Sequence, residues 1–190
     1  MSDISFEDRT VIVTGAGNGL GKAYAIELGN RGAKVVVNDL GGSVDGSGSG
    51  STPADEVVNE IIANGGEAVA NYDSVATKDG GEAIVQTAID SFGTVDAVIN
   101  NAGILRDKSF AKMTEEELSL IIDVHLKGTF FVSQPAFTVM KEKNYGRIVN
   151  VASPSGLFGN FGQSNYGAAK MGIVGLTNVL AIEGAKYNIK

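Results

Sequence analysis

Short apolar segments alternate with segments of helical character along the whole chain, and this alternation is the feature that most restricts the fold. We expect strands at residues 10–14, 34–38, 67–71, 95–99 and 147–151. We expect helices at about 19–31, from 52 to the glycine pair at 65–66, at 78–92, at 114–143 and at 164–186. Strands that alternate with helices form a parallel sheet covered on both faces, and strands buried on both sides need no polar alternation. The sequence therefore predicts an α/β fold with a doubly wound parallel sheet.

The length of 190 residues is typical of one domain, and we expect a single domain over residues 1–190. A chain of this size buries roughly 70% of the surface that it exposes when unfolded, which is enough for a hydrophobic core. The Gly/Ser-rich stretch at 41–51 has the composition of a linker. It lies too close to the N-terminus to separate two domains, so we interpret it as a surface loop.

Composition and charge argue against several classes of partner. The formal net charge of −7 argues against nucleic acid, because phosphate backbones are bound by clustered Lys and Arg. The chain has no cysteine and one histidine, His125. This excludes disulfides, zinc-thiolate sites and multi-histidine sites, and we expect no bound metal. Residues 1–9 lack the apolar core of a signal peptide, and no apolar run reaches the roughly 20 residues that span a bilayer. We therefore expect an intracellular protein without a membrane segment.

A glycine-rich turn follows the first predicted strand. Gly15, Gly19 and Gly21 have the spacing G-x-x-x-G-x-G, and Asn18 and Leu20 lie within it. Glycines at a junction of strand and helix allow a tight turn and bring backbone N–H groups close to a pyrophosphate at the helix N-terminus. The alternative is a glycine-rich turn that binds no ligand. The position between strand and helix favours a Rossmann-type dinucleotide site with these five residues in contact with the cofactor.

Asp39 ends the second predicted strand. A carboxylate at that place accepts hydrogen bonds from ribose hydroxyls and repels a 2′-phosphate, which favours NAD over NADP. The alternative is that Asp39 only begins the turn before the glycines at 41–42. We expect the cofactor to be NAD.

Tyr166 and Lys170 are four residues apart on the last predicted helix, so their side chains share one face. A phenol exchanges protons poorly at neutral pH, and a nearby ammonium group favours the phenolate. Ser153 follows the fifth predicted strand, at the sheet edge where such folds bind ligands, and its hydroxyl can hydrogen-bond a substrate oxygen. The alternative for the Tyr–Lys pair is an exposed helix face without chemistry.

Together these segments resemble the short-chain dehydrogenase/reductase superfamily. The resemblance rests on TGAGNGLG at 14–21, NNAG at 100–103, Ser153 and YGAAK at 166–170. It implies an oxidoreductase in which Tyr166 is the acid/base, Lys170 binds the nicotinamide ribose and tunes Tyr166, and Ser153 orients a small-molecule substrate. It also implies cofactor contacts from Asn101, Ala102 and Gly103, and adenine contacts from Ser74 and Val75.

Further segments resemble the (3R)-hydroxyacyl-CoA dehydrogenase unit of type 2 multifunctional enzymes of fatty-acid β-oxidation. They are VVVNDLGG at 35–42, ANYDSV at 70–75, NNAGILRD at 100–107, DVHLKG at 123–128 and GLFGNFGQSNY at 156–166. The implied reaction is the reversible oxidation of a 3-hydroxyacyl-CoA with NAD, in the cytoplasm or in peroxisomes. The alternatives are a 3-oxoacyl-thioester reductase, a hydroxysteroid or alcohol dehydrogenase, and a non-catalytic NAD-binding module.

His125 stands where most of the superfamily has an asparagine that bends the long helix and joins a proton relay to Lys170. The resemblance therefore places His125 with the catalytic residues, and the alternative is a packed histidine without a proton role. Phe158 and Phe161 are expected to border the substrate pocket or to pack in a core or interface. Arg106 and Lys108 are expected at an ordinary solvated surface rather than on acyl-CoA phosphates.

Members of the superfamily usually continue beyond the point that corresponds to Lys190. We therefore expect the sheet to stop before its last two strands, with one edge uncovered and apolar helix faces exposed. We expect such a chain alone to be unstable or poorly active. The segments 114–143 and 164–186 resemble the dimer-forming helices of the superfamily, so we also expect a homodimer.

Overall fold

The computed structural model describes residues 4–42, 45, 48 and 52–190. The expected surface loop at 41–51 lies mostly outside the described residues. Within the described part the strands are β1 Thr10–Thr14, β2 Lys34–Asn38, β3 Glu67–Asn71, β4 Ala97–Asn100 and β5 Arg147–Asn150. All neighbouring strands pair in parallel, in the order β3-β2-β1-β4-β5. The predicted doubly wound α/β fold is confirmed.

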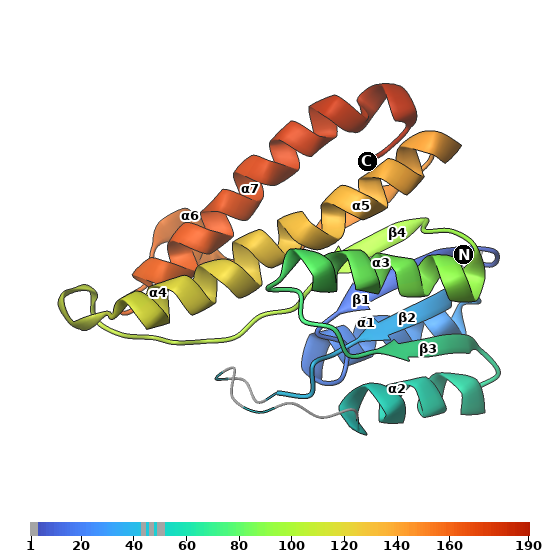
Figure 1. The fold of residues 1–190 in the computed structure, drawn as a ribbon, viewed down its shortest axis with the longest axis horizontal. Helices are drawn as coiled ribbons and strands as arrows, with labels where there is room; N and C mark the ends of the chain where they lie inside the picture. Colours follow the sequence, from blue (N-terminus) through green and yellow to red (C-terminus); the bar gives the residue numbers. More distant parts are fainter. Residues whose placement is uncertain (1–3, 43–44, 46–47, 49–51) are drawn as a thin grey trace.

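Helices cover both faces of this sheet (Figure 1). They are α1 Gly19–Asn30, α2 Thr52–Ala63, α3 Lys78–Phe92, α4 Glu115–Ile121, α5 Gly128–Lys143, α6 Pro154–Phe158 and α7 Ser164–Gly184. On β1, Val11 and Val13 pack with α1 and α2, whereas Ile12 faces the cluster that includes α3 and α5. The two-residue period of a strand thus supplies two separate hydrophobic cores from one run of apolar residues.

The prediction of one helix at 114–143 is wrong in one respect, because this segment is not one regular helix. A capping box begins α4: the Thr114 hydroxyl accepts from the Glu117 N–H at 3.2 Å, and the Glu117 carboxylate accepts from the Thr114 N–H at 3.0 Å. Residues Ile122–Lys127 (η2) then form a π-helical segment before α5 begins at Gly128. Because π-helical residues bond five positions apart, this segment re-aims the side chains that it carries, and such segments are frequent at functional sites.

Other boundaries differ from the expected ones by a few residues. The strand expected at 95–99 begins at Ala97 and ends at Asn100, and Val95 is buried just before it. The last helix ends at Gly184 and continues as a 3-10 turn, Ala185–Tyr187. The short helix α6 was not expected. Its signal was present in Ser153-Pro154, because proline suits the first position of a helix and serine suits the cap.

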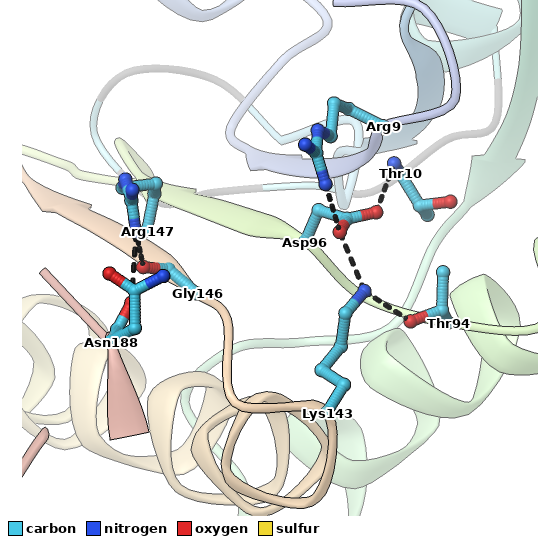
Figure 2. A network of polar contacts seen from close by, with 8 residues as sticks. All are labelled: Arg9, Thr10, Thr94, Asp96, Lys143, Gly146, Arg147 and Asn188. Carbon is cyan, nitrogen blue, oxygen red and sulfur yellow. Dashed lines mark hydrogen bonds and ion pairs between the residues drawn. The ribbon is translucent and has the colours of Figure 1, made fainter. Parts of the chain in front are cut away.

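At the amino ends of the strands a buried carboxylate joins three elements (Figure 2). Asp96 precedes β4 and is 2% exposed. Its carboxylate accepts from Lys143 Nζ at 2.6 Å, from the Thr10 N–H at 2.9 Å and from Arg9 Nη1 at 3.3 Å. Lys143 also donates to the Thr94 hydroxyl at 2.8 Å. Together, these bonds fasten the start of β1 and the end of α5 to the start of β4.

The last residues of the chain lie beside β5. Ile189 pairs in parallel with Gly146, and the Ile148 N–H donates to the Lys190 carbonyl at 2.9 Å. Val149 on β5 is 52% exposed, and Ile182 on α7 is 78% exposed. The expected exposure of apolar side chains is observed, but the expected edge is not fully uncovered, because residues 189–190 hydrogen-bond to the backbone of β5.

Candidate active site

The glycines of the turn after β1 have different physical roles. Gly15 and Gly19 have φ angles of +62° and +55°, in the left-handed region that glycine adopts without strain. A Cβ on Gly15 would lie 2.7 Å from Ala102 Cα, and a Cβ on Gly21 would collide with the Gly15 carbonyl oxygen. A Cβ on Gly19 would meet nothing within 4 Å. Gly15 and Gly21 therefore permit close packing of the turn, whereas Gly19 lies on its open side.

This turn delivers the chain directly into α1. Asn18 is the extended residue before that helix, and its side chain makes no capping hydrogen bond. N–H groups in the first turn of a helix have no partners within the helix, and the helix dipole favours an anion there. The turn therefore fits a phosphate group.

A cavity of about 480 Å³ lies over this turn at the carboxyl ends of the strands. The predicted cofactor residues that line it are Gly15, Asn18, Gly19, Leu20, Asp39, Ser74, Val75, Asn101, Ala102 and Gly103. Sequence reasoning missed other lining residues, namely Asn38, Leu40, Gly42, Gly48, Asp73, Ala76, Ile104, Leu120 and Val124. Asp73 could have been found from its place after β3. Leu120 and Val124 could not, because they reach the cavity from α4 and η2 without a local motif.

Asp39 lies at the cavity wall and also braces the turn. Its two carboxylate oxygens accept from the Gly17 N–H and the Gly41 N–H, each at 2.7 Å. A Cβ on Gly17 would lie 2.8 Å from this carboxylate. The absence of a side chain at Gly17 thus lets Asp39 approach the phosphate turn.

Asn101 holds the turn from the β4 side. Its side-chain amide donates to the carbonyls of Thr14 and Gly15, each at 3.0 Å. The N–H groups of Asn101 and Ala102 both donate to the Thr14 hydroxyl at 3.1 Å. Sequence reasoning missed Thr14, whose signal is its place at the end of β1 directly before the glycines. Asn101 and Thr14 together fix the shape of the cavity floor.

Tyr166 and Lys170 lie on α7 and meet as predicted. Lys170 Nζ is 5.6 Å from the centre of the Tyr166 ring. Lys170 is 3% exposed, and its ammonium donates to the Val151 carbonyl at 2.6 Å. Burial lowers the pKa of Lys170 from 10.5 to about 8, because desolvation disfavours the charged form. At neutral pH this site still holds a buried positive charge beside a phenol.

His125 connects this pair to the cavity. Its ring lies edge-on to the Tyr166 ring, with centroids 5.1 Å apart and an interplanar angle of 85°. His125 Nε2 is 2.8 Å from the Ile104 carbonyl oxygen and 3.1 Å from the Ile104 N–H nitrogen. His125 therefore contacts both Tyr166 and Ile104, a residue of the cavity wall, whereas Tyr166 is not among the described residues that line the cavity.

The imidazole is held in its neutral form. Burial, and after it the charge of Lys170, lower the pKa of His125 from 6.5 to about 4. Its Nδ1 atom is buried and makes no hydrogen bond within the described residues. A Cβ on Gly103 would collide with this ring at about 2.5 Å. The glycine at 103 therefore makes room for the histidine.

Ser153 lies at the end of β5 and caps α6. Its hydroxyl oxygen accepts from the Ser155 N–H at 3.2 Å, which leaves the hydroxyl hydrogen free to donate. The helix packs closely on α7: a Cβ on Gly156 would lie 3.1 Å from Lys170 Cβ. Ser153 is thus brought to the α7 face that carries Lys170, two residues beyond the carbonyl to which Lys170 donates.

Other features of the described residues do not compete with this site. A more open hollow of about 620 Å³ lies at the opposite, amino edge of the sheet, with walls from residues 4–7, 27–32 and 64–67. Neither the glycine turn nor the Tyr–Lys pair contributes to it. In the described part of the chain no group of three His, Cys, Asp or Glu side chains could hold a metal ion, and no helix is long and apolar enough to cross a membrane.

Comparison with known proteins agrees with this arrangement. The sequence model of the short chain dehydrogenase family matches residues 9–190. The chain is 62% identical over 187 residues to the peroxisomal hydratase-dehydrogenase-epimerase of Saccharomyces cerevisiae. The aligned region covers 98% of this chain and 21% of the yeast protein. It is 57% identical over 188 residues to the peroxisomal multifunctional enzyme type 2 of Mus musculus, which covers 99% of this chain and 25% of the mouse protein.

A solved short chain dehydrogenase from Mycobacterium avium has the same fold, with a TM-score of 0.90 and 46% identity over 97% of this chain and 65% of that one. The chain therefore spans about a fifth to a quarter of the two peroxisomal relatives and about two thirds of the mycobacterial structure. With the family match running from β1 to the last residue, the glycine turn, Ser153 and the Tyr166–Lys170 pair belong to one continuous unit, and the chain is a member of the short chain dehydrogenase family.

Proposed function

We propose that this chain is an NAD-dependent (3R)-hydroxyacyl-CoA dehydrogenase, which oxidises the 3-hydroxyl group of an acyl-CoA to a ketone and runs in reverse as a reductase. The observation that carries the proposal is the buried ammonium of Lys170 beside the Tyr166 phenol, which His125 links to Ile104 at the wall of the cavity over the glycine turn. Two relatives with 62% and 57% identity have names that describe peroxisomal multifunctional enzymes, one of them with a dehydrogenase activity.

Tyr166 is the residue that takes the proton of the substrate hydroxyl. A phenol becomes a competent base only when its anion is stabilised, and a cation within about 6 Å supplies that stabilisation. Lys170 is such a cation, at 5.6 Å from the ring centre. In the oxidation the phenolate form of Tyr166 would take the hydroxyl proton and become the phenol, and the hydride of carbon 3 would pass to bound NAD, so charge and electrons balance.

Lys170 stays charged at pH 7 because its pKa of about 8 lies above that pH. The Val151 carbonyl accepts one of its hydrogens at 2.6 Å, which fixes the ammonium in place. The other N–H groups of an ammonium remain free to donate, and we propose that they hold the nicotinamide ribose. The neutral imidazole of His125 adds no second positive charge at this pH.

Ser153 stabilises the substrate oxygen while its charge changes. Its hydroxyl oxygen is already occupied by the Ser155 N–H, so its hydrogen is the group left to donate. A donor held in place before the reaction stabilises an oxygen that becomes more negative, and loss of one such donor typically costs about 10²-fold in rate or more.

We propose His125 as a third partner of Tyr166, with Nδ1 as the group that exchanges protons through water.

The residues present fit NAD. Two features fit the pyrophosphate. Gly19 is in the left-handed region and has no atom within 4 Å of the position of a Cβ, and the start of α1 has no side-chain cap. The Asp39 carboxylate lies at the cavity wall, where it accepts from ribose hydroxyls and repels the 2′-phosphate of NADP. When bound there, NAD accepts the hydride that leaves carbon 3 of the substrate. We propose that Ser74 and Val75 contact the adenine and that Ala102 and Gly103 contact the nicotinamide half.

The acyl chain of the substrate is assigned to the side of α6 and the turn before α7. Phe158 and Phe161 are 86% and 89% exposed there, on either side of Gly159. Both lie within the segment between Ser153 and Tyr166, and we propose that an apolar chain attached to carbon 3 lies against them. The thioester end would then face the cavity mouth.

A panel of two substrates and two cofactors tests the function. Purified protein is incubated with (3R)- or (3S)-hydroxybutyryl-CoA and with NAD or NADP, and NADH or NADPH formation is followed by absorbance. We expect turnover with the (3R) substrate and NAD, and at least about tenfold lower kcat/KM with NADP, because the 2′-phosphate would meet Asp39. A preference for NADP, or no turnover of either thioester when other alcohols are oxidised, would refute the cofactor or the substrate assignment.

We also propose a homodimer that acts inside the cell, in the cytoplasm or in peroxisomes. Apolar side chains on α7 and α5 are exposed, with Ile182, Val179, Met171 and Phe130 at 46–78%. Such side chains on neighbouring helices are typical of an obligate contact between copies. Light scattering that gives only the monomer mass at micromolar concentration would contradict the dimer, and fractionation of cells tests the compartment.

A further inference from the structure

The side chain of Asn165 joins three segments directly beside Tyr166. Asn165 is fully buried, at 0% exposure. Its Nδ2 donates to the Arg106 carbonyl at 3.0 Å and to the Glu117 carbonyl at 3.1 Å. Its Oδ1 accepts from the Tyr166 N–H at 2.8 Å. One carboxamide thus contacts the segment after β4, helix α4 and the first turn of α7.

These neighbours fix the orientation of the carboxamide. Two carbonyls can only accept, so they require the NH₂ end, and the Tyr166 N–H can only donate, so it requires the oxygen. Both hydrogens and one oxygen lone pair are used. A buried polar side chain with its partners satisfied holds its neighbours in one register, which an apolar side chain of the same size would not do.

Asn165 also performs the task of a helix cap. Gln163 stands at the N-cap position of α7, but its side chain makes no capping hydrogen bond. The Tyr166 N–H is one of the first-turn donors that lack a partner within the helix. Asn165 Oδ1 satisfies it from inside the same turn. The Asn165 side chain therefore holds Tyr166 through the backbone N–H of Tyr166.

The 104–108 segment and the turn before α7 are joined by two further hydrogen bonds a few residues away. The Lys108 N–H donates to the Gly162 carbonyl at 2.8 Å, and Gln163 Nε2 donates to the Asp107 carboxylate at 2.8 Å. These two bonds are exposed or lie at the surface, whereas the side chain of Asn165 is fully buried. The segment at 104–108 begins with Ile104, which lines the cavity and contacts His125.

We propose that Asn165 is a positioning residue for Tyr166: its carboxamide locks the start of α7 to α4 and to the 104–108 segment, so that the phenol keeps one distance to Lys170, His125 and the cavity. This inference rests on the proposed role of Tyr166 as the acid/base. Asn165 itself touches no reacting atom.

The test compares Asn165→Asp with Asn178→Asp in the whole protein. The first change keeps the shape but turns a donor into a carboxylate oxygen that faces two carbonyls. The second makes the same charge change at an exposed position of the same helix. We expect kcat of Asn165→Asp to fall about tenfold to a hundredfold, as displacement of a catalytic group by about 1 Å does. The KM for NAD should stay within about twofold of the wild-type value, because the dinucleotide turn lies outside this joint.

Asn165→Ala removes all three bonds without adding charge, and it serves if the aspartate variant does not fold. We expect the same split, with reduced kcat and retained NADH binding. Asn178→Asp should match the wild type. Wild-type kcat in both Asn165 variants would overturn the proposal, and so would an equal loss of kcat and of NADH affinity, which indicates general unfolding.

A wrong substrate class does not affect this test, because any alcohol that the wild type oxidises can be used. A measurement without any variant or substrate gives a second answer. In hydrogen exchange of the wild type, the Tyr166 amide should be strongly protected although it lies in the first turn of a helix, where amides usually exchange fast. Fast exchange at Tyr166 would overturn the joint even if the enzyme is active.

Discussion

Two polar clusters lie at opposite edges of the sheet, and they differ in how their charges are paired. At the amino edge, the Asp96 carboxylate has ammonium, guanidinium and backbone N–H partners (Figure 2). At the carboxyl edge, Lys170 is equally buried, but its hydrogen-bond partner is the neutral Val151 carbonyl, and in the described part of the chain no carboxylate pairs with it. His125 there has a nitrogen without a hydrogen bond among these residues.

The difference separates stability from chemistry. A buried charge with charged and hydrogen-bonded partners is held in one state, and removal of a partner is costly. The fold keeps a buried charge without a counterion in place although desolvation disfavours it. The pKa of a lysine at such a place falls toward neutral pH. The paired edge therefore holds the sheet together, and the unpaired edge carries the lysine that we propose acts on Tyr166.

Lys170→Met should show the largest effect. We expect kcat to fall by about 10²-fold or more, because Tyr166 loses the buried ammonium that lies beside its ring. The melting temperature should stay equal or rise, since a desolvated charge is removed. Enzyme assay and calorimetry measure both. Lys143→Met is the matched control, because it removes a lysine from the paired cluster, and it should lower the melting temperature with kcat retained. The reverse pattern would break the comparison.

Asp96→Ala should reduce the free energy of unfolding by about 2–3 kcal/mol, because Lys143 and Arg9 lose their shared partner and are partly exposed. Urea unfolding followed by circular dichroism measures the change. The folded fraction should keep kcat within about twofold, since the cluster lies at the edge of the sheet away from the cavity. A loss of kcat that exceeds the loss of folded protein would show that the two edges are not separate.

The pH dependence of stability sharpens the comparison. Lys170 has a pKa of about 8 in the fold and 10.5 when unfolded. Between these two values the unfolded state binds more protons, so stability rises with pH. The wild type should therefore gain stability relative to Lys170→Met as pH rises from 8 toward 10. Parallel curves for the two proteins in urea titrations at each pH would contradict the buried ammonium.

The last expected effect, of similar size to that of Lys170, is on the acid side. His125 has a pKa of about 4 in the fold and 6.5 when unfolded. The unfolded state again binds more protons in this window, so the wild type loses stability as pH falls from 6.5 to 4. His125→Asn, which keeps one donor and one acceptor for Ile104, should lose less. Equal losses in thermal melts would show that the imidazole is not held neutral.

Local patterns in the sequence were sufficient for the strands, for most helices and for the glycine turn. In each case the signal lies within a few consecutive residues, as in Gly15 and Gly19 or in the capping box at Thr114. Local residues did not predict the π-helical segment with His125, because they would suit a regular helix equally well; only the resemblance pointed to a bend at this position. The joint at Asn165 was not predictable either, because its partners Arg106 and Glu117 lie far away in the chain.

The residues that line the cavity show the same limit. Leu20 and Ser74 follow strands and could be named from the sequence, whereas Leu120 and Val124 reach the cavity only through the packing of α4 and η2. Asp96 gave no sequence signal of its role, since a carboxylate after a short turn is usually exposed. Its burial follows from the register of β1 against β4.

A single-turnover experiment tests the central claim, that Tyr166 takes the proton which lets hydride leave the substrate. The protein is mixed with excess NAD and a limiting amount of (3R)-hydroxybutyryl-CoA, and NADH formation is followed by stopped flow for the wild type and Tyr166→Phe. The account predicts at least about a hundredfold slower NADH formation in Tyr166→Phe, with the affinity for NADH unchanged. NADH formation at the wild-type rate in Tyr166→Phe would contradict it.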